Sequence, residues 1–248
     1  MDFGPGRREA SFADLAGALG PGPTILEPIF DGARDDLLRR PVAEHIAGWA
    51  ADLRDRGRPV VGLLGYCAGA ALACGLADEL AYSAAVEAPV VVLLDPLVID
   101  SAGLYANFET AVESFADVVD PDEMAGVRAE ALAAARAPGA LDDPATTVAT
   151  IAAGYERVVT ASSDLLGLDD ELAEQFTDYF ELYLSYLALA AQAGVKGSRP
   201  PRTVVLTSAE HTAPDGWAAD EVFGVSREDL LADPAVAVAV ARCLTGRS

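Results

Sequence analysis

One cysteine stands in a sequence context that suits nucleophilic chemistry. The segment VVGLLGYCAGA, residues 60–70, places Cys67 between Gly65 and Gly69 in the pattern G-x-C-x-G. This pattern is typical of a nucleophile elbow, a sharp strand-to-helix turn that holds the reactive side chain in a strained backbone conformation. Side chains at the glycine positions would collide across such a turn. We therefore predict that the thiol of Cys67 stands above a sheet edge, at a helix N-terminus whose dipole favours a thiolate.

The same pattern also fits a purely structural strand–turn–helix unit with a buried cysteine. Neither G-x-G-x-x-G nor G-K-[ST] occurs, so a dinucleotide site or a P-loop is not indicated. The other two cysteines, Cys74 and Cys243, are predicted to be small core residues.

A carboxylate and a histidine are candidates to assist the cysteine. Asp95 ends the apolar segment VVVLLD, and His211 follows the apolar segment TVVLT. Residues that follow parallel strands lie at the same sheet edge, so Asp95 could orient a histidine, and His211 could act as the base. The alternatives are a loop-capping role for Asp95 and an ordinary loop histidine at His211. His45 is predicted to pack on a helix flank.

The elements that must position these residues follow from the hydrophobic pattern. Strand and helix patterns alternate along the first hundred residues, which predicts an α/β fold with a mostly parallel sheet flanked by helices. Strands are expected at Thr24–Phe30, Pro59–Gly65 and Pro89–Leu94, with helices at Ser11–Leu19, Pro41–Arg56 and Ala68–Leu80. The strand pattern returns at Thr203–Thr207 and weakly at Glu221–Val225, before a closing helix at Pro234–Leu244.

A long helical block interrupts the strand pattern. Helices are expected at Asn107–Val119, Asp122–Ala137, Thr147–Ser162 and Asp170–Ala193. In the last of these, Phe176, Phe180 and Tyr183 belong to an apolar stripe at helical spacing, which either lines an acyl tunnel or forms the core of the block. We expect one domain overall, with a core in residues 1–99 and 199–248 and a helical lid in residues 100–198.

The composition narrows the classes of partner and compartment. Asp and Glu number 39 against 17 Lys and Arg, giving a net charge of −22, which disfavours nucleic acid and membrane surfaces. No stretch approaches the roughly 20 apolar residues of a membrane helix, and no signal peptide is visible. An odd number of cysteines, three, together with the lack of a visible signal peptide, leads us to expect a cytoplasmic protein with reduced thiols. No metal and no cofactor are expected.

At this point the chain resembles the thioesterase family of polyketide and nonribosomal-peptide biosynthesis, in the α/β-hydrolase superfamily. The features that carry the likeness are the elbow GYCAGA, Asp95 at its spacing, the helical block before the last strands, the N-terminal FGPGRREASFADLA, and the ending DLLADPAV at 229–236. The resemblance implies an α/β-hydrolase fold with an inserted lid, and an oxyanion hole formed by the N–H groups of Ala68 and Gly6.

The chain departs from the family at one position. The family's histidine normally stands a few residues before the terminal L-L-x-x-P segment, where this chain has Arg227. Arg227 could instead pair with Asp95, which would leave the cysteine without a base. Cysteine tolerates this better than serine, because exchanging one thiolate for another needs little proton transfer.

The resemblance to Cys-containing relatives implies a carrier-protein acyltransferase or a Dieckmann-type cyclase. The expected substrate is a small acyl group on the phosphopantetheine of an acyl or peptidyl carrier protein, transferred through an acyl-Cys67 intermediate. Cyclising release or transfer to a second acceptor is expected over simple hydrolysis. Two alternatives stay open: a hydrolytic editing thioesterase using Cys67, His211 and Asp95, and a catalytically degenerate binding protein.

Overall fold

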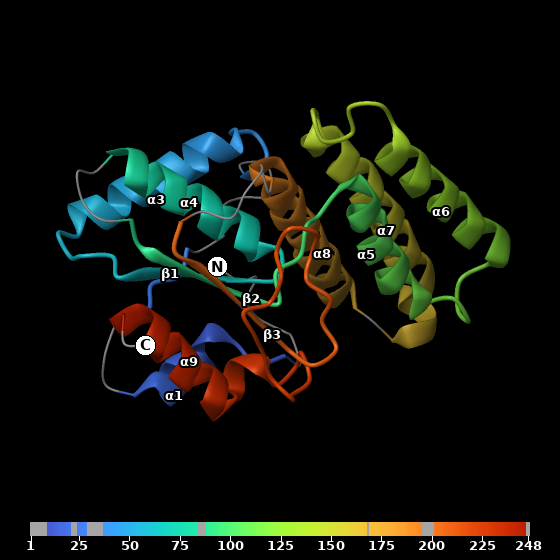
Figure 1. The fold of residues 1–248 in the computed structure, drawn as a ribbon. Coiled ribbons are helices and arrows are strands. Elements are labelled where there is room, and N and C mark those ends of the chain that lie inside the picture. Colours follow the sequence, from blue (N-terminus) through green and yellow to red (C-terminus); the bar gives the residue numbers. More distant parts are fainter. Residues whose placement is uncertain are drawn as a thin grey trace. The chain divides into compact units, whose positions relative to one another are not determined.

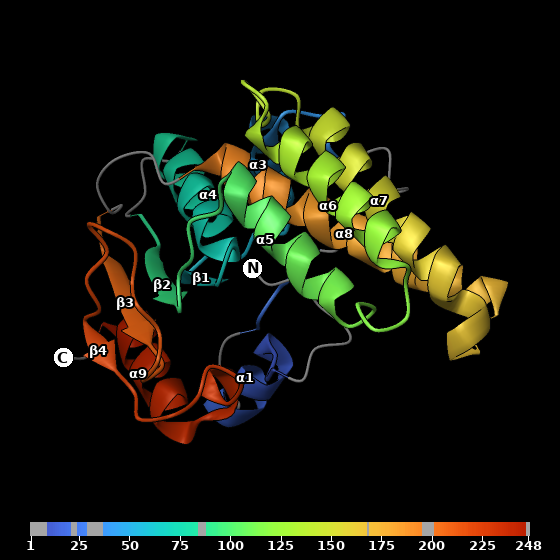
Figure 2. The same ribbon diagram turned by 90° about the vertical axis from the view of Figure 1, so that its right-hand side faces the viewer.

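The chain forms an α/β structure that divides into two compact units. The computed structural model describes residues 9–20, 24–28, 37–83, 88–167, 169–194 and 201–246. The first unit comprises Met1–Ile29, Val42–Val98 and Ala193–Ser248, and the second comprises Phe30–Pro41 and Ile99–Gln192. Figure 1 labels most elements of both units, and Figure 2 also labels β4.

A parallel sheet is the centre of the first unit. Its strands are β1 (Gly62–Tyr66), β2 (Val90–Leu94), β3 (Thr203–Thr207) and β4 (Glu221–Val222), in the order β1-β2-β3-β4. Each neighbouring pair is parallel. All five residues of β2 are buried, as expected of a strand covered on both faces. The predicted α/β class and parallel sheet are confirmed for the described residues.

Helices cover both faces of this sheet. On one side α4 (Gly69–Ser83) packs on β1 and is covered by α3 (Val42–Asp55). On the other side α9 (Pro234–Thr245) packs on β2, and α1 (Phe12–Leu19) and the short 3-10 helix η1 (Leu230–Ala232) pack against α9. Figure 1 shows the two helical layers on opposite sides of the strands, and Figure 2 shows β3 and β4 beside α9.

Strand register brings three chain segments to one edge of the sheet. Tyr66 of β1 pairs with Leu94 of β2, which in turn pairs with Leu206 of β3. The next residues in each case, Cys67, Asp95 and the pair Thr207–Ser208, therefore leave the sheet at the same carboxyl edge. This is where functional groups collect in parallel α/β sheets.

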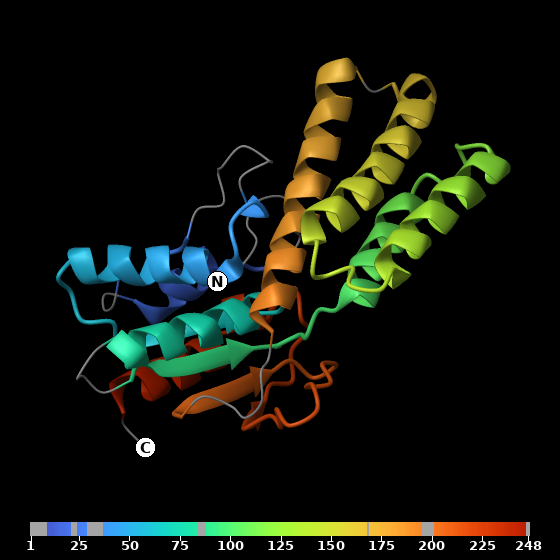
Figure 3. The same ribbon diagram turned by 90° about the horizontal axis from the view of Figure 1, so that it is seen from above.

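The second unit is helical. It contains α5 (Ser101–Glu113), α6 (Pro121–Arg136), α7 (Pro144–Leu166) and α8 (Asp170–Ala193, which ends at the unit boundary). Helices α5, α6 and α7 pack against one another, and they lie side by side in Figures 2 and 3. Side chains of Asp100, Asp120 and Asp143 accept hydrogen bonds from first-turn N–H groups of α5, α6 and α7.

Some predicted element boundaries were wrong. Residues 24–28 of the expected strand Thr24–Phe30 have no regular structure, and Pro28 lacks the N–H that a sheet would need. Helices α5 and α7 begin earlier than expected because aspartate caps precede them. The weak strand expected at Glu221–Val225 is confined to Glu221–Val222. No helix in the described part of the chain is both long and apolar enough to cross a bilayer.

Candidate active site around Cys67

Cys67 occupies a strained turn between β1 and α4. Its φ is 53°, in the left-handed region that non-glycine residues rarely adopt. The turn is held from both sides: the N–H of Cys67 donates to the carbonyl of Leu94 at 3.0 Å, and the N–H of Leu97 donates to the carbonyl of Cys67 at 3.1 Å. The side chain is 7% exposed. The strand, the strained turn and the helix have the geometry of a nucleophile elbow.

Gly65 allows the helix to approach the strand at this turn. A Cβ added at Gly65 would lie 2.7 Å from the Cα of Ala70 and 3.0 Å from the Cβ of Ala73. The nearer of these atoms is backbone, which cannot rotate out of the way. Only glycine fits here, as the elbow pattern predicts.

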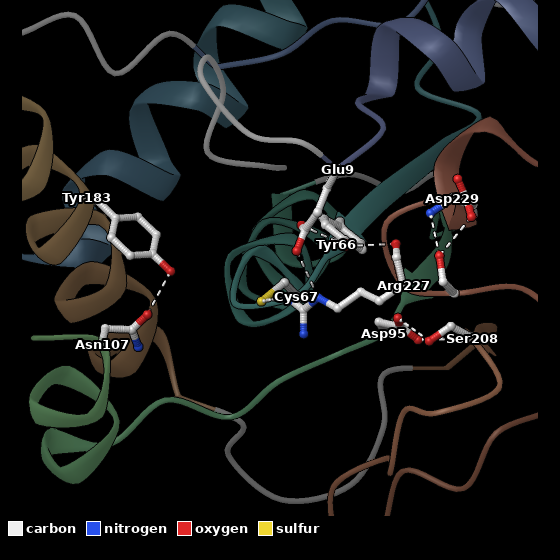
Figure 4. A network of polar contacts seen from close by, with 10 residues as sticks. Glu9, Tyr66, Cys67, Asp95, Asn107, Tyr183, Ser208, Arg227 and Asp229 are labelled. Carbon is white, nitrogen blue, oxygen red and sulfur yellow. Dashed lines mark hydrogen bonds and ion pairs between the residues drawn. The ribbon is translucent and has the colours of Figure 1, made fainter. Parts of the chain in front are cut away.

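The immediate partner of the cysteine sulfur is a guanidinium. Nη2 of Arg227 donates to Sγ of Cys67 at 2.9 Å, which Figure 4 shows. Hydrogen bonds from charged donors are the strong ones, and a guanidinium beside sulfur stabilises a thiolate more than a thiol. Arg227 stands at the position where the family resemblance implied a histidine. The polar contact on sulfur is therefore cationic, and it offers no lone pair to act as a base.

Glu9 and Tyr66 hold Arg227 in place. Nε of Arg227 lies 3.4 Å from Oε1 of Glu9, as an ion pair without hydrogen-bond geometry. The phenol of Tyr66 donates to Oε2 of Glu9 at 3.0 Å, and the guanidinium lies 5.5 Å from the centre of the Tyr66 ring. Glu9, Tyr66 and Arg227 thus form one polar cluster, in which Arg227 contacts the sulfur (Figure 4).

The protonation states in this cluster follow from burial and neighbouring charge. Burial is the main cause of a pKa of Tyr66 above its ordinary 10.0, and it outweighs Arg227, which alone would lower it. Burial would lower the pKa of Arg227, but the neighbouring Cys67, Tyr66 and Glu9 outweigh it and raise this pKa above its ordinary value. Tyr66 therefore stays a neutral donor, and Arg227 stays a cation.

Backbone contacts fix the loop that carries Arg227. The N–H of Ala10 donates to the carbonyl of Glu228 at 2.8 Å, which ties the segment after Glu9 to this loop. The hydroxyl of Ser226 donates to Oδ2 of Asp229 at 2.8 Å and closes a local turn around Arg227. The guanidinium is consequently delivered to the sulfur by a constrained backbone.

Asp95 is paired with a serine. Its side chain is completely buried, and it accepts from the N–H of Ser208 at 2.8 Å and from the hydroxyl of Ser208 at 2.7 Å. Its φ of 42° again lies in the left-handed region. The carboxylate therefore joins the ends of β2 and β3. The structure pairs Asp95 with neither Arg227 nor a histidine within the described residues.

His211 lies near this edge without contacting the sulfur. Its Nε2 is 3.0 Å from the carbonyl oxygen of Pro96, and its N–H donates to the carbonyl of Ser208 at 3.4 Å. Across the described ranges, no hydrogen bond links His211 to Cys67 or Asp95. Cys67, Asp95 and His211 thus leave the same sheet edge but form no hydrogen-bonded triad. The other histidine, His45, is buried in α3 with its ring 6.0 Å from that of Trp49.

One of the two expected oxyanion donors can be located. Ala68 lies between Cys67 and the first residue of α4, and no hydrogen bond from its N–H to any described residue is present. This N–H is consequently available to a developing oxyanion. The other expected donor, Gly6, lies outside the described residues.

The three aromatic residues expected to bind substrate differ in environment within the second unit. Phe180 is buried and packs on Tyr155, with ring centroids 4.2 Å apart. Phe176 is 44% exposed. The hydroxyl of Tyr183 donates to Oδ1 of Asn107 at 3.0 Å (Figure 4). Phe180 thus contributes to the core of this unit, and substrate binding by any of the three stays a prediction.

Two residues of the cluster carried no signal in the sequence. Glu9 lies 57 positions from Tyr66, and nothing in its local pattern indicates a link to the elbow. Tyr66 is adjacent to Cys67 in the sequence, which is the one available hint.

Comparison of the chain with protein-family models and with curated proteins finds no match.

Proposed function

We propose that this protein is a thioesterase-like acyltransferase with an α/β-hydrolase fold, which takes an acyl group from a carrier-protein thioester onto Cys67. The observation that carries the proposal is the contact between Nη2 of Arg227 and Sγ of Cys67 at 2.9 Å, on an elbow with φ of 53°. A sulfur that accepts a hydrogen bond from a guanidinium at the carboxyl edge of a parallel sheet stands where nucleophiles of this kind act.

The first step needs no proton transfer. The Cys67 thiolate attacks the carbonyl carbon of the thioester, a tetrahedral oxyanion forms, and the bond to the carrier sulfur breaks. A thiolate is consumed and a thiolate is released, so charge balances and the leaving group needs no acid. The N–H of Ala68 is positioned to stabilise the oxyanion. This chemistry suits a site whose sulfur contacts a cation and no imidazole within the described residues.

The second step favours acceptors other than water. Hydrolysis of an acyl-cysteine requires a base to activate water. The imidazole of His211 contacts the carbonyl oxygen of Pro96 and, within the described residues, forms no hydrogen bond with Cys67 or Asp95. Transfer to a second carrier thiol, or cyclising release by a nucleophile within the acyl chain, does not require that base in the same way. We therefore favour transfer or cyclisation over hydrolysis.

Intact mass measurement tests the proposal. The protein is incubated with acyl-pantetheine thioesters of several chain types and quenched in acid, and the mass increment is located by peptide mapping. We expect one acyl group on Cys67 in the wild type and none in Cys67→Ala. If no acyl chain gives an adduct on Cys67, the proposal fails.

Two variants separate transfer from hydrolysis. The triad alternative requires His211→Ala to abolish turnover of acyl-pantetheine, because the imidazole would activate water. The transfer mechanism predicts that His211→Ala forms acyl-Cys67 at a rate within about threefold of wild type. Arg242→Gln, on the surface of α9, is the control for substitution as such.

A second candidate function is binding without catalysis. Cys67 is only 7% exposed, and Arg227 replaces the expected base, as in a degenerate site. This candidate predicts that Cys67 is neither acylated nor rapidly alkylated at neutral pH.

A further inference from the structure

Arg227 has more hydrogen-bond donors than its partners use. A guanidinium carries five N–H groups. Nη2 donates to Sγ of Cys67, while Nε faces Glu9 without a hydrogen bond. Within the part of the chain that the structure describes, Nη1 contacts no hydrogen-bond acceptor, and the side chain is 34% exposed. A cationic hydrogen-bond donor, with N–H groups on Nη1 that no described residue accepts, therefore lies directly beside the sulfur (Figure 4).

Acylation of Cys67 would remove one of the two groups that face the positive charge of Arg227. In the free protein, the sulfur and the Glu9 carboxylate both face the single positive charge of Arg227. A thioester sulfur is neutral and a weak hydrogen-bond acceptor, so Nη2 loses its partner when acyl-Cys67 forms. The carbonyl carbon bonded to Sγ is then the neighbour of two unsatisfied terminal nitrogens. The N–H groups on these two nitrogens can therefore bind an anion beside the acyl carbon, which is the atom that an acceptor must attack.

We propose that Arg227 binds the acceptor of the second step, and that it selects acceptors that react as anions, a thiolate or an enolate, over water and alcohols. This inference rests on the acyl-Cys67 intermediate of the proposed function. The cation stabilises an attacking anion next to the acyl carbon, whereas it provides no means of removing a proton from a neutral hydroxyl.

The step balances in charge and atoms. The anionic sulfur or carbon of the acceptor bonds to the acyl carbon, the bond from that carbon to Sγ breaks, and the negative charge returns to Sγ. A thiolate gives a new thioester, and an enolate gives a carbon–carbon bond. Arg227 then contacts the sulfur again, as in the free protein. Thiols and 1,3-dicarbonyl compounds supply such anions near neutral pH, and water and alcohols do not.

A discharge experiment tests the selection. Acetyl-Cys67 is formed from acetyl-pantetheine, excess donor is removed, and the loss of the acetyl group is followed by intact mass. Four conditions are compared: N-acetylcysteamine, acetylacetone, N-acetylethanolamine and buffer alone. Each rate is divided by the rate for the acetyl thioester of N-acetylcysteine under the same condition, which removes the intrinsic reactivity of the acceptor.

We expect discharge of acetyl-Cys67 by the thiol and by acetylacetone to be about 10- to 100-fold faster than discharge of the reference thioester, which is the range of one charge-assisted hydrogen bond. Discharge by the alcohol and by water should not be faster than in the reference. Acceleration by the thiol alone identifies a thiolate acceptor, and acceleration by acetylacetone alone identifies an enolate. In Arg227→Gln the advantage of anionic acceptors should disappear, while Arg227→Lys, which keeps the charge, retains part of it. Arg242→Gln is the matched control.

The inference and the proposed function fail in different ways. If acetyl-Cys67 never forms, the proposed function fails and this inference fails with it. If acetyl-Cys67 forms but alcohol and water are accelerated as much as the thiol, only the inference is overturned. The same holds if folded Arg227→Gln, checked by its unfolding midpoint, keeps the full preference for anions.

Discussion

At the scale of single residues, the site depends on a cation where a base was expected. Arg227 and Cys67 are 160 positions apart, and only the fold brings them within 2.9 Å. The position of Cys67 on a strained strand-to-helix turn could be predicted from the sequence, because the G-x-C-x-G pattern is local and has a steric cause. It could not predict the partner of sulfur, since that contact depends on two loops meeting. Arg227 was noticed only because the family resemblance implied another residue there.

Tyr66 should make the protein sensitive to high pH. Its pKa is raised in the folded protein, so its contribution to stability is complete below the unfolded value of 10.0 and is lost as the pH rises beyond that value. We expect the free energy of unfolding to fall above pH 10, and to fall less steeply in Tyr66→Phe. Tyr82→Phe, at a 92% exposed position, should leave the slope unchanged. Urea titrations at several pH values measure this, and equal slopes in wild type and Tyr66→Phe would contradict it.

Asp95 should act as a structural link more than as a catalytic group. Asp95→Ala removes both acceptors of Ser208 and should cost about 2–4 kcal/mol of stability. Asp95→Asn can accept from the N–H and donate to the hydroxyl of Ser208, so it should cost about 1 kcal/mol or less. Chemical denaturation gives both values. In a working triad, the asparagine variant would lose about 10⁴-fold in turnover; we expect its rate of Cys67 acylation to stay within about threefold.

At the scale of elements, buried strands were the most predictable part of the fold. Apolar segments with β-branched residues gave β2 and β3 within one residue. The end of β1 was also close, because the elbow marks it. Helix starts were less accurate, since single capping aspartates decide them. The strand expected over Thr24–Phe30 was wrong at residues 24–28, because an apolar segment forms a strand only where a neighbouring strand can pair with it.

Two glycines provide a test of how closely α4 must approach its neighbours. Gly65→Ala would drive a methyl group into the backbone of Ala70 at 2.7 Å, and should cost about 2–3 kcal/mol or prevent folding. In Gly75→Ala the methyl meets only the mobile end of Ile46 at 2.6 Å, and alanine gains helix propensity, so the net change should be within about 1 kcal/mol. Equal stabilities of the two variants in denaturant titrations would show that the elbow is not tightly packed.

At the scale of the whole molecule, negative charge exceeds what internal pairing can balance. The chain has 39 acidic and 17 basic side chains, which gives a net charge of 17 − 39 = −22 with histidine neutral. The ion pairs formed by Arg54, Arg128, Arg157 and Arg242 are partly exposed to solvent, so each contributes little to stability. Self-repulsion should therefore oppose folding at low ionic strength.

Salt should consequently stabilise the protein. Raising sodium chloride from 10 to 300 mM shortens the screening length from roughly 30 Å to about 6 Å. We expect the unfolding temperature to rise by a few degrees, on the order of 1 kcal/mol. Choline chloride should give the same curve, because screening does not depend on the cation. A flat or falling midpoint in calorimetry would show that the excess charge does not oppose folding.

The proposed activation of Cys67 by Arg227 is tested most directly by the rate of alkylation at pH 7.5. Iodoacetamide is added, and each cysteine is followed by peptide mass. Cys74 and Cys243 are internal controls, since burial raises the pKa of Cys74 to about 12 and also raises that of Cys243. We predict that Cys67 reacts fastest, and that Arg227→Gln slows it about 10- to 100-fold while Arg242→Gln does not. A Cys67 that reacts no faster than Cys243, or equally fast without Arg227, would contradict this.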